Sequence, residues 1–310
     1  MTLEACLLCG GETSLVEAGL IDNRFGAPGA WNIHRCRACG LEQTLPRPDA
    51  TTLKRLYETY YNDGGATATS YAGWRERFLM SPLYRVFLKL DGDISFHGER
   101  GTGRLLDVGC NEGRGLVLYR ANGFAAEGLE LNRVAAAEAR ARRFAVHEVD
   151  IGDFRPAAPF DRVVLSNVLE HALDPGAMLS DVHRLLAPGG EAWISLPNAA
   201  SWLRAAFGRH WINWHVPYHI VHFTQGRLAA LLVERGFEVA SARHVTPGLW
   251  VAQSAIAFAF AGRPEQARRL RSTVLVAALT AVARGLLFPL LWWGNRRRRG
   301  DCLVVKARRL

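Results

Sequence analysis

The segment Leu105–Gly115 reads LLDVGCNEGRG and decides the fold of this chain. Its apolar start is typical of a short strand, and a glycine turn then leads into a helix that begins near Leu116. Gly109, Gly113 and Gly115 allow positive φ and let a ligand approach the backbone closely. The N-terminus of the following helix offers free N–H groups to a polar or anionic group. The spacing G-x-x-x-G-x-G differs from the dinucleotide and P-loop patterns, and alone it also fits a glycine turn in any α/β protein.

Two acidic residues follow, each in one of the next apolar segments. Glu130 lies in the segment Gly128–Asn132, 23 positions after Asp107, and Asp150 lies near the end of the segment Val146–Ile151. In a doubly wound sheet, an acid at the tip of the second strand accepts both hydroxyl hydrogens of a ribose. An acid at the end of the third strand is placed to reach an adenine amino group. The spacing therefore favours a ligand that contains a nucleoside.

Further strands are expected downstream, and they complete an α/β pattern. They fall at Phe160–Asn167, at Glu191–Asn198 after the turn Ala187–Gly190, at Phe237–Val239 and at Cys302–Arg308.

Five ordered segments resemble those of the class I S-adenosylmethionine-dependent methyltransferases, in particular bacterial small-molecule enzymes. They read LLDVGCNEGRG, GLELN, EVDIGDF, FDRVVLSNVLEHALDP and LLAPGGEAWISLPN. The resemblance covers about residues 103–245 together with the terminal strand. It implies a doubly wound, seven-stranded, Rossmann-like sheet and the transfer of a methyl group from S-adenosylmethionine.

The resemblance also implies which residues bind this cofactor. The methionine part would be surrounded by Asp107, Gly109, Cys110, Gly113 and Gly115. Glu130 would bind the ribose hydroxyls, Leu131 would pack on the adenine, and Asp150 would read the adenine amino group, with Ile151 in the same site. The site would be lined near the transferred methyl by Asn167 and Leu169.

Glu170-His171 follows the fourth strand at the reacting end of the sheet. Similar enzymes of ubiquinone-type and sugar methylation carry Glu-His at this place, which implies that His171 lines the active site and can act as a base. The Asn-Pro-Pro-Tyr/Phe segment that holds a planar nitrogen during adenine or glutamine methylation is absent from this place. Oxygen is therefore the expected acceptor atom, with carbon as the alternative.

Four cysteines form two similar turns near the N-terminus. Cys6-Leu-Leu-Cys9 and Cys36-Arg-Ala-Cys39 are each followed by glycine, and together they predict a closed tetrahedral zinc site of four thiolates. A hairpin from Ser14–Asp22 and Trp31–Arg35 would fill the loop between them. Such a site is structural, because it leaves no open position for chemistry. The alternatives are two redox-active C-x-x-C turns, or a site in which His34 replaces one thiolate.

A helical connector is expected between this ribbon and the cofactor domain, beginning after Pro46-Arg47-Pro48. In similar methyltransferases this region covers the cofactor, so Tyr61 or Tyr71 would touch the methionine end. Ordinary helix packing explains these aromatic residues equally well.

Histidines and tryptophans gather in residues 210–224, where this fold places its substrate-facing crossover. A histidine there can take the proton of a hydroxyl as the methyl group is transferred, which makes His219 and His222 candidates beside His171. His215, His219 and His222 have the spacing of a metal-binding helix face, but Pro217 argues against a regular helix. A structural role for these histidines is the third interpretation.

Between the last two expected strands lies an apolar insertion of about 56 residues, 246–301. Its second apolar block, Thr273–Gly294, contains Arg284 and Pro289 and ends in Trp292-Trp293, close to Arg296–Arg299. Tryptophans beside arginines suit in-plane attachment to a membrane surface. The alternatives are a helical cap or dimer contact, and a true membrane span. A span is opposed by the basic link Arg263–Arg271, which joins the first apolar block, Gly248–Gly262, to the second.

Composition bounds the class of protein. The chain has 310 residues, 49% of them hydrophobic, and a net charge of +9. The segment around the four cysteines holds more acidic than basic residues, which disfavours nucleic acid as a partner. No signal peptide is recognised, so a cytoplasmic location at the inner face of the membrane is expected, and there the cysteines stay reduced or bind metal.

The sequence thus predicts a zinc-ribbon-like segment (1–45), a helical connector or lid (46–100), a cofactor-binding domain (101–245), the apolar insertion (246–301) and a terminal strand (302–310). The expected activity is methylation of a sugar, a lipid-linked molecule or a quinone-like molecule at the membrane face, with S-adenosylmethionine as cofactor and structural zinc. An RNA methyltransferase and a non-catalytic membrane adaptor are the alternatives, and the oligomeric state is left open.

Overall fold

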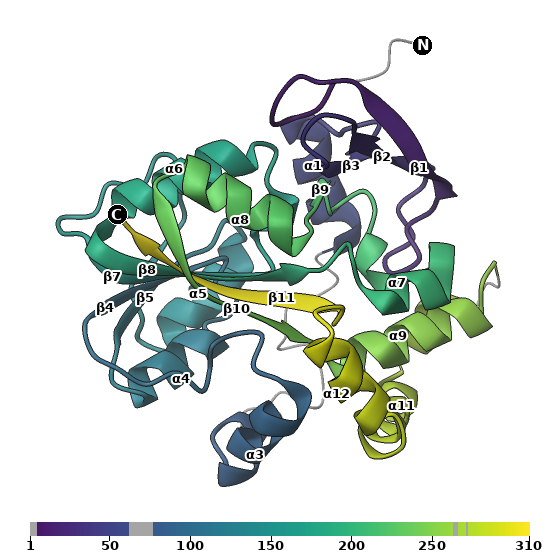
Figure 1. Cartoon of the computed structure of the whole chain (residues 1–310). Helices are drawn as coiled ribbons and strands as arrows, with labels where there is room; N and C mark the ends of the chain where they lie inside the picture. The colour runs from purple at the N-terminus through teal and green to yellow at the C-terminus, as the bar shows by residue number, and fades with distance from the viewer. Residues whose placement is uncertain (1–4, 62–76, 263–265, 271) are drawn as a thin grey trace.

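The computed structural model describes residues 5–61, 77–262, 266–270 and 272–310, and they form two sheets (Figure 1). The larger sheet has seven strands, which confirms the predicted fold class. Its spatial order is β10 (Phe237–Val245), β11 (Cys302–Arg309), β8 (Leu186–Pro197), β7 (Phe160–Ser166), β4 (Arg104–Val108), β5 (Ala125–Leu129) and β6 (Val146–His147). Strands β8, β7, β4, β5 and β6 run parallel, and β11 is antiparallel to both of its neighbours.

Alternating side chains of the central strands pack into separate cores on the two faces of this sheet. Val163 and Leu165 of β7 pack on one face with the helices α6 (Pro175–Leu185) and α8 (Gln225–Glu234). Val164, between them, points to the opposite face. There it meets the core shared by α4 (Arg114–Ala121), α5 (Arg133–Ala141) and α9 (Gly248–Ala259).

The smaller sheet combines the N-terminal segment with a distant part of the chain. Its order is β1 (Thr13–Leu20), β2 (Trp31–Cys36), β3 (Glu42–Leu45) and β9 (Val221–His222), all antiparallel. The hairpin expected between the two cysteine turns is therefore present. Strand β9 was not expected here, because it belongs to the histidine-rich stretch, which follows β8 in the sequence. We call residues 210–224 the histidine loop.

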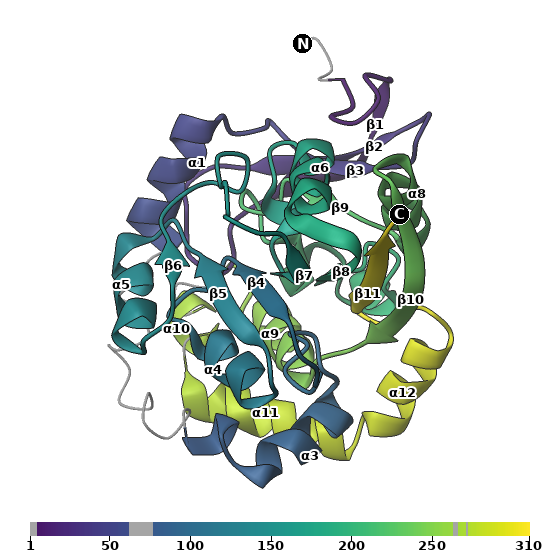
Figure 2. The same cartoon turned by 90° about the vertical axis from the view of Figure 1, so that its left-hand side faces the viewer.

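The remaining helices connect or extend these layers. They are α1 (Ala50–Leu56), the π-helical turn η1 (Tyr57–Tyr61), α3 (Pro82–Asp91), η3 (Leu169–His171), α7 (Trp202–Phe207), η4 (Gly208–His210), η5 (Ile212–Trp214), α10 (Gln266–Leu270), α11 (Thr273–Gly285) and α12 (Phe288–Arg296). Helices α9–α12 form the insertion between β10 and β11. In both views α3, α11 and α12 lie at the opposite end of the protein from the small sheet (Figures 1 and 2). Helix α9 lies between, and its Val251 shares a core with Leu20, Trp31 and Ile33 of the small sheet.

Three expected strands differ in length from the structure. The sixth, expected at Phe237–Val239, is β10 and continues to Val245. The third is only β6, because the backbone turns at residues 150–153, where Asp150 accepts a hydrogen bond from the backbone N–H of Gly152 at 2.9 Å. The fifth begins earlier than expected, at Leu186, so the Pro-Gly-Gly segment lies within β8.

Candidate functional site

The glycine turn after β4 adopts the backbone conformation that its sequence predicts. Gly109 and Gly113 have φ values of 71° and 79°, and α4 begins directly after Gly113. A Cβ atom on Gly115 would lie only 3.0 Å from Oδ2 of Asp107. The glycine at the start of α4 therefore lets the helix pass close to a buried carboxyl group. Gly109, Cys110 and Asn111 of the same turn face the end of β5, since the N–H groups of Gly109 and Cys110 donate to the carbonyl oxygen of Leu129.

Asp107 and Glu130 face this turn from two neighbouring strands. Burial, and after it the charge of Glu130, raise the pKa of Asp107 to about 7. The Glu130 carboxylate accepts hydrogen bonds from the backbone N–H groups of Asn111 and Asn132, at 2.9 and 2.7 Å. These two amides fix the carboxylate at the end of β5, the place where a ribose is bound in a doubly wound sheet.

The other expected cofactor residues differ in exposure. Leu131 is 65% exposed beside Glu130, and Asp150 is exposed at the turn after β6, so both are accessible to a ligand. Ile151 and Leu169 are buried in the core below α6. Asn167 has a positive φ of 55° at the end of β7 and is partly exposed.

A cavity of about 600 Å³ lies where β7 and β8 end. Five segments far apart in the sequence form its walls. The lining residues are Arg24 and Phe25 from the β1–β2 loop, Asn167, His171 and Pro197 from the ends of β7 and β8, Asn213, His215 and His219 from the histidine loop, and Leu249, Trp250, Gln253 and Leu270 from the insertion. Polar and aromatic side chains thus share the walls, and none of these described lining residues is acidic.

His171 reaches this cavity in a defined tautomer. Its Nδ1 lies 3.0 Å from the carbonyl oxygen of Tyr218 and 2.8 Å from the hydroxyl of Tyr57. A carbonyl oxygen only accepts, so Nδ1 carries the proton and Nε2 keeps its lone pair. Burial lowers the pKa of His171 to about 4, which keeps the ring neutral near pH 7.

His219 is oriented by the backbone of its own loop. Its Nδ1 lies 2.9 Å from the carbonyl oxygen of Asn213 and therefore donates, which leaves Nε2 to accept from Nδ1 of His215 at 3.2 Å. Burial lowers the pKa of both histidines well below the ordinary value. The rings of His171 and His219 meet edge to face, with their centroids 4.7 Å apart.

Glu170 lies behind these rings. Its side chain is buried, and among the described residues neither carboxyl oxygen has a hydrogen-bond partner. Nε2 of His219 lies 3.9 Å from Oε1 of Glu170. Burial raises the pKa of Glu170 to about 8, so the carboxyl group is mostly protonated near pH 7. Ligand atoms of Glu170, His171 and His219 lie within 4.8 Å of one another, a grouping that could hold a metal ion.

His222, the third histidine expected to be catalytic, lies on the far side of the loop from this cavity. It belongs to β9, its Nε2 is 3.0 Å from the hydroxyl oxygen of Thr44, and its ring packs edge to face on Trp214. Burial lowers its pKa to about 3. The structure does not bring His222 together with His171 and His219 in the cavity walls, so the geometry gives its catalytic role no support.

The four cysteines of the two turns converge. Sγ of Cys6 lies 3.6 Å from Sγ of Cys39, Sγ of Cys9 lies 3.5 Å from Sγ of Cys36, and all four sulfur atoms lie within 4.8 Å of one another. His34 lies on β2, outside this group, with its Nδ1 3.4 Å from the hydroxyl oxygen of Thr13. Tyr71 and the side chain of Tyr61, expected over the cofactor, lie outside the described residues.

Several cavity residues were not anticipated from the sequence. Arg24 and Phe25 sit in a loop inside the expected zinc ribbon, and Trp250 and Gln253 lie in the apolar insertion. Arg24 donates to the side-chain oxygen of Gln253 at 2.9 Å, which joins these two segments across the cavity. No local pattern marks them, because their proximity depends on tertiary packing.

Comparison with known proteins identifies the class. Residues 71–242, more than half of the chain, match the methyltransferase domain family. The chain belongs to this family, as the resemblance predicted.

Individual relatives match only part of the chain. A probable S-adenosylmethionine-dependent methyltransferase of Mycolicibacterium smegmatis is 31% identical over 158 residues, which are 50% of this chain and 60% of the relative. A ubiquinone biosynthesis O-methyltransferase of Sodalis glossinidius is 29% identical over 147 residues, 44% of this chain and 59% of the relative. The chain thus spans about three fifths of the length of these relatives.

Among solved structures, the 1,6-didemethyltoxoflavin-N1-methyltransferase of Burkholderia thailandensis is 16% identical. The match covers 95% of this chain and 99% of that one, with a TM-score of 0.46.

Proposed function

We propose that the protein transfers the methyl group of S-adenosylmethionine to a hydroxyl oxygen of a small molecule that binds in the 600 Å³ cavity. The cofactor supplies an electrophilic methyl group. As the S–CH3 bond breaks and the O–CH3 bond forms, the hydroxyl proton passes to Nε2 of His171, and S-adenosylhomocysteine leaves. The observation that carries the proposal is the tautomer of His171, whose hydrogen bond to the Tyr218 carbonyl leaves the Nε2 lone pair available.

The residues around the glycine turn fit the cofactor. The fixed Glu130 carboxylate would hold the ribose hydroxyls, exposed Leu131 would cover one adenine face, and Asp150 would accept from the adenine amino group. The glycine turn at Gly109 and Gly113, beside Asp107, would hold the methionine part. Asn167, which also lines the acceptor cavity, would lie between the two ligands.

The walls of the cavity favour a ring-shaped acceptor with polar substituents. Phe25 and Trp250 offer aromatic faces, and Arg24, Asn213 and Gln253 offer hydrogen-bonding groups. Quinone-like and sugar acceptors, free or lipid-linked, share these properties. The ubiquinone biosynthesis O-methyltransferases among the relatives support oxygen as the methylated atom and a quinone-like ring as the first class to test.

We also propose that the four cysteines hold one structural zinc ion. A tetrahedron with Zn–S bonds of about 2.3 Å has S···S edges of about 3.8 Å. The Cys6–Cys39 and Cys9–Cys36 S···S distances, 3.6 and 3.5 Å, are close to that value. Four protein ligands close the coordination shell, so the ion would stabilise the small sheet and take no part in methyl transfer.

Titration calorimetry of the purified chain with S-adenosylhomocysteine, with zinc measured on the same sample, tests both proposals. We expect micromolar binding and about one zinc per chain. A folded protein without affinity for S-adenosylhomocysteine would overturn the cofactor assignment, and a metal-free folded protein would overturn the zinc assignment. Transfer of labelled methyl groups into quinone-like, sugar and lipid fractions then identifies the acceptor, and labelling only at nitrogen would exclude methylation of oxygen.

A further inference from the structure

Three helices from two distant segments share one exposed apolar face. Helix α3 exposes Leu83, Val86 and Leu90, and the preceding residues Phe78 and Met80 are exposed too. The α11–α12 region exposes Val274, Val282, Leu286, Leu287, Phe288, Leu290, Trp292 and Trp293. The three helices lie next to one another along the lower side of the molecule in both views (Figures 1 and 2). We call these exposed side chains the apolar face.

A buried ion pair joins the two segments that build this face. The Arg284 guanidinium pairs with the Asp91 carboxylate at the end of α3 and also donates to the Asp91 carbonyl oxygen at 3.0 Å. The backbone N–H of Gly248 donates to the same carboxylate at 2.9 Å, which brings α9 into the joint. Arg284 therefore serves an internal contact, and the apolar face is not interrupted by its charge.

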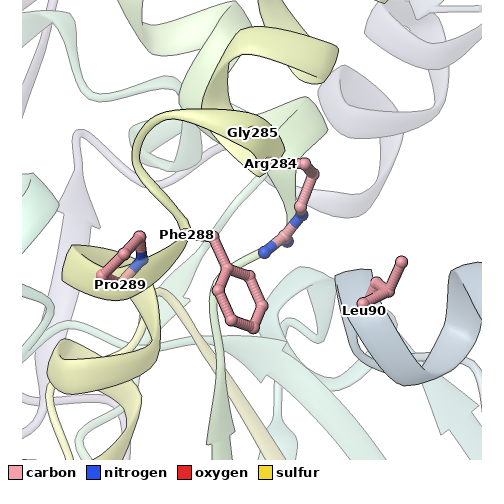
Figure 3. A pocket seen from close by; sticks show the side chains of 5 residues that line it. All are labelled: Leu90, Arg284, Gly285, Phe288 and Pro289. Carbon is pink, nitrogen blue, oxygen red and sulfur yellow. The ribbon is translucent and has the colours of Figure 1, made fainter.

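A hollow of about 290 Å³ lies in this face where α3 meets the insertion. Leu90, Arg284, Gly285, Phe288 and Pro289 line it (Figure 3). Apart from Arg284, whose charge is directed to Asp91, these walls are apolar. The face thus offers an apolar recess as well as protruding side chains.

The exposed charged side chains that the structure describes on α3, α11 and α12 all have one sign. Arg85 and Lys89 of α3 are exposed, and so are Arg296–Arg299 at the end of α12. In the described stretches 77–90 and 266–300 the sequence contains no Asp or Glu. The guanidinium carbons of Arg296 and Arg297 lie 4.4 and 5.1 Å from the ring centres of Trp292 and Trp293, so aromatic and cationic groups alternate at the rim.

From this combination we propose that the apolar face docks in-plane on the surface of an anionic lipid bilayer. Leu286 and the neighbouring apolar side chains enter the acyl region, Trp292 and Trp293 lie at the headgroup level, and the rim of Arg and Lys contacts lipid phosphates. A second copy of the chain fits less well, because a symmetric contact through this face would bring two Arg296–Arg299 clusters together.

A bound bilayer would lie beside the helices that close the acceptor cavity. Helix α9 packs against α11, and its Leu249, Trp250 and Gln253 line the cavity. The insertion thus carries the apolar face on α11 and α12 and a wall of the cavity on α9. If methyl transfer proceeds as proposed, docking delivers a membrane-dissolved acceptor to the cavity. Docking itself does not depend on that chemistry.

Among the described residues no single helix has the length and composition to cross a bilayer. Helices α11 and α12 have this length and composition only when they are taken together, and they are bent by 69° relative to each other.

Flotation of the full chain with phosphatidylcholine vesicles, with and without phosphatidylglycerol, tests the proposal. We expect at least about tenfold stronger binding to the anionic vesicles and a loss of binding as salt is added. Val274→Asp and Leu286→Asp, at side chains that are 75% and 77% exposed, should each weaken binding by about tenfold or more.

Val233→Asp is the matched control, because Val233 is 64% exposed on α8 and lies outside the apolar face. It should bind vesicles like the wild type, and all three variants should retain affinity for S-adenosylhomocysteine, which shows that they fold. Equal loss of binding in all three variants, or no vesicle binding by the wild type, would overturn the docking surface. If sedimentation shows a dimer that the Leu286→Asp substitution dissociates, the occupant of the apolar face is a second copy of the chain and not a lipid bilayer. None of these three results would bear on cofactor binding.

Discussion

Residues 107–151 supply nearly all of the expected cofactor contacts, whereas the acceptor cavity takes its walls from residues as far apart as Arg24 and Leu270. In the cofactor region, backbone amides and glycines dominate. In the acceptor cavity, side chains from the β1–β2 loop, the histidine loop and the insertion meet. The first region is therefore set by local sequence, and the second depends on how the additional segments pack on the common sheet. A family can keep the first and change the second, which is why the class of reaction is shown here and the acceptor is proposed.

The largest expected effect lies in the acceptor cavity. His171→Ala should lower the turnover number by about 100-fold to 10,000-fold, because it removes the proposed base. The affinity for S-adenosylhomocysteine should stay within a factor of about 2, since His171 belongs to the acceptor region. Turnover with the identified acceptor and calorimetry give the two values. His210→Ala, outside the cavity walls, is the control, and equal losses in turnover and cofactor affinity would contradict the division between the regions.

The next effect concerns stability and pH. Burial raises the pKa of Glu170 to about 8, so the folded protein retains a proton that the unfolded chain, with an ordinary pKa near 4.3, releases. Between about pH 4.5 and about pH 8 the folded state binds more protons, and the contribution of Glu170 to the free energy of unfolding falls as pH rises.

Glu170→Gln should remove this contribution. Relative to the variant, the wild type should lose a few kcal/mol of unfolding free energy between about pH 5 and about pH 8. Urea denaturation of both proteins across this interval measures the difference. If the unfolding free energies of the wild type and the variant change equally with pH, Glu170 is ionised in the folded state, as a bound metal ion would require.

In the cofactor region, Glu130→Ala should raise the dissociation constant for S-adenosylhomocysteine by about 10-fold to 100-fold. The change removes two hydrogen bonds from ribose hydroxyls to a charged group, which contribute about 1.5–3 kcal/mol. Glu238→Ala, on exposed β10, serves as the control. Unchanged affinity in calorimetry would remove Glu130 from the ribose site.

The smallest effect is expected for Leu131→Ala. The exposed side chain would lose its packing on the adenine, and the dissociation constant should rise by about threefold to tenfold. Because Leu131 has few protein contacts to lose, the melting temperature should not change. A lowered melting temperature with unchanged affinity would assign Leu131 to folding instead.

The sequence predicts the large sheet well because its signals are local. Strand periodicity and the glycine turn are signals that extend over only a few residues, and the structure has β4, β7 and α4 close to where they place them. The β1–β2 hairpin was predicted for the same reason. Strand β5 ends at Leu129, three residues before the expected end, so Glu130 directly follows it. The third strand was predicted too long, since the apolar pattern of Val146–Ile151 does not reveal that the Asp150 carboxylate caps a turn.

The full set of cavity walls and the contact between α3 and the insertion were beyond such reasoning. His219 and His222 look alike in the sequence, yet one lines the cavity and the other packs against Thr44 and Trp214. Arg284 reads as an interruption of an apolar helix, and only the position of Asp91, 193 residues earlier, shows where its charge is balanced. Contacts of this kind depend on tertiary packing, which one sequence does not encode in any local pattern.

The pairing of β3 with β9 has a consequence for the modularity of the chain. Thr44 of β3 donates its hydroxyl hydrogen to the carbonyl oxygen of His219 at 2.6 Å and its backbone N–H to that of Ile220 at 2.9 Å. Residues 1–45 are therefore no detachable appendage: a chain that lacked them would also lose the strand that holds the histidine loop in place. By thermodynamic linkage, whatever binds the four cysteines and stabilises the small sheet also orders the wall of the acceptor cavity, more than 170 residues further along the chain.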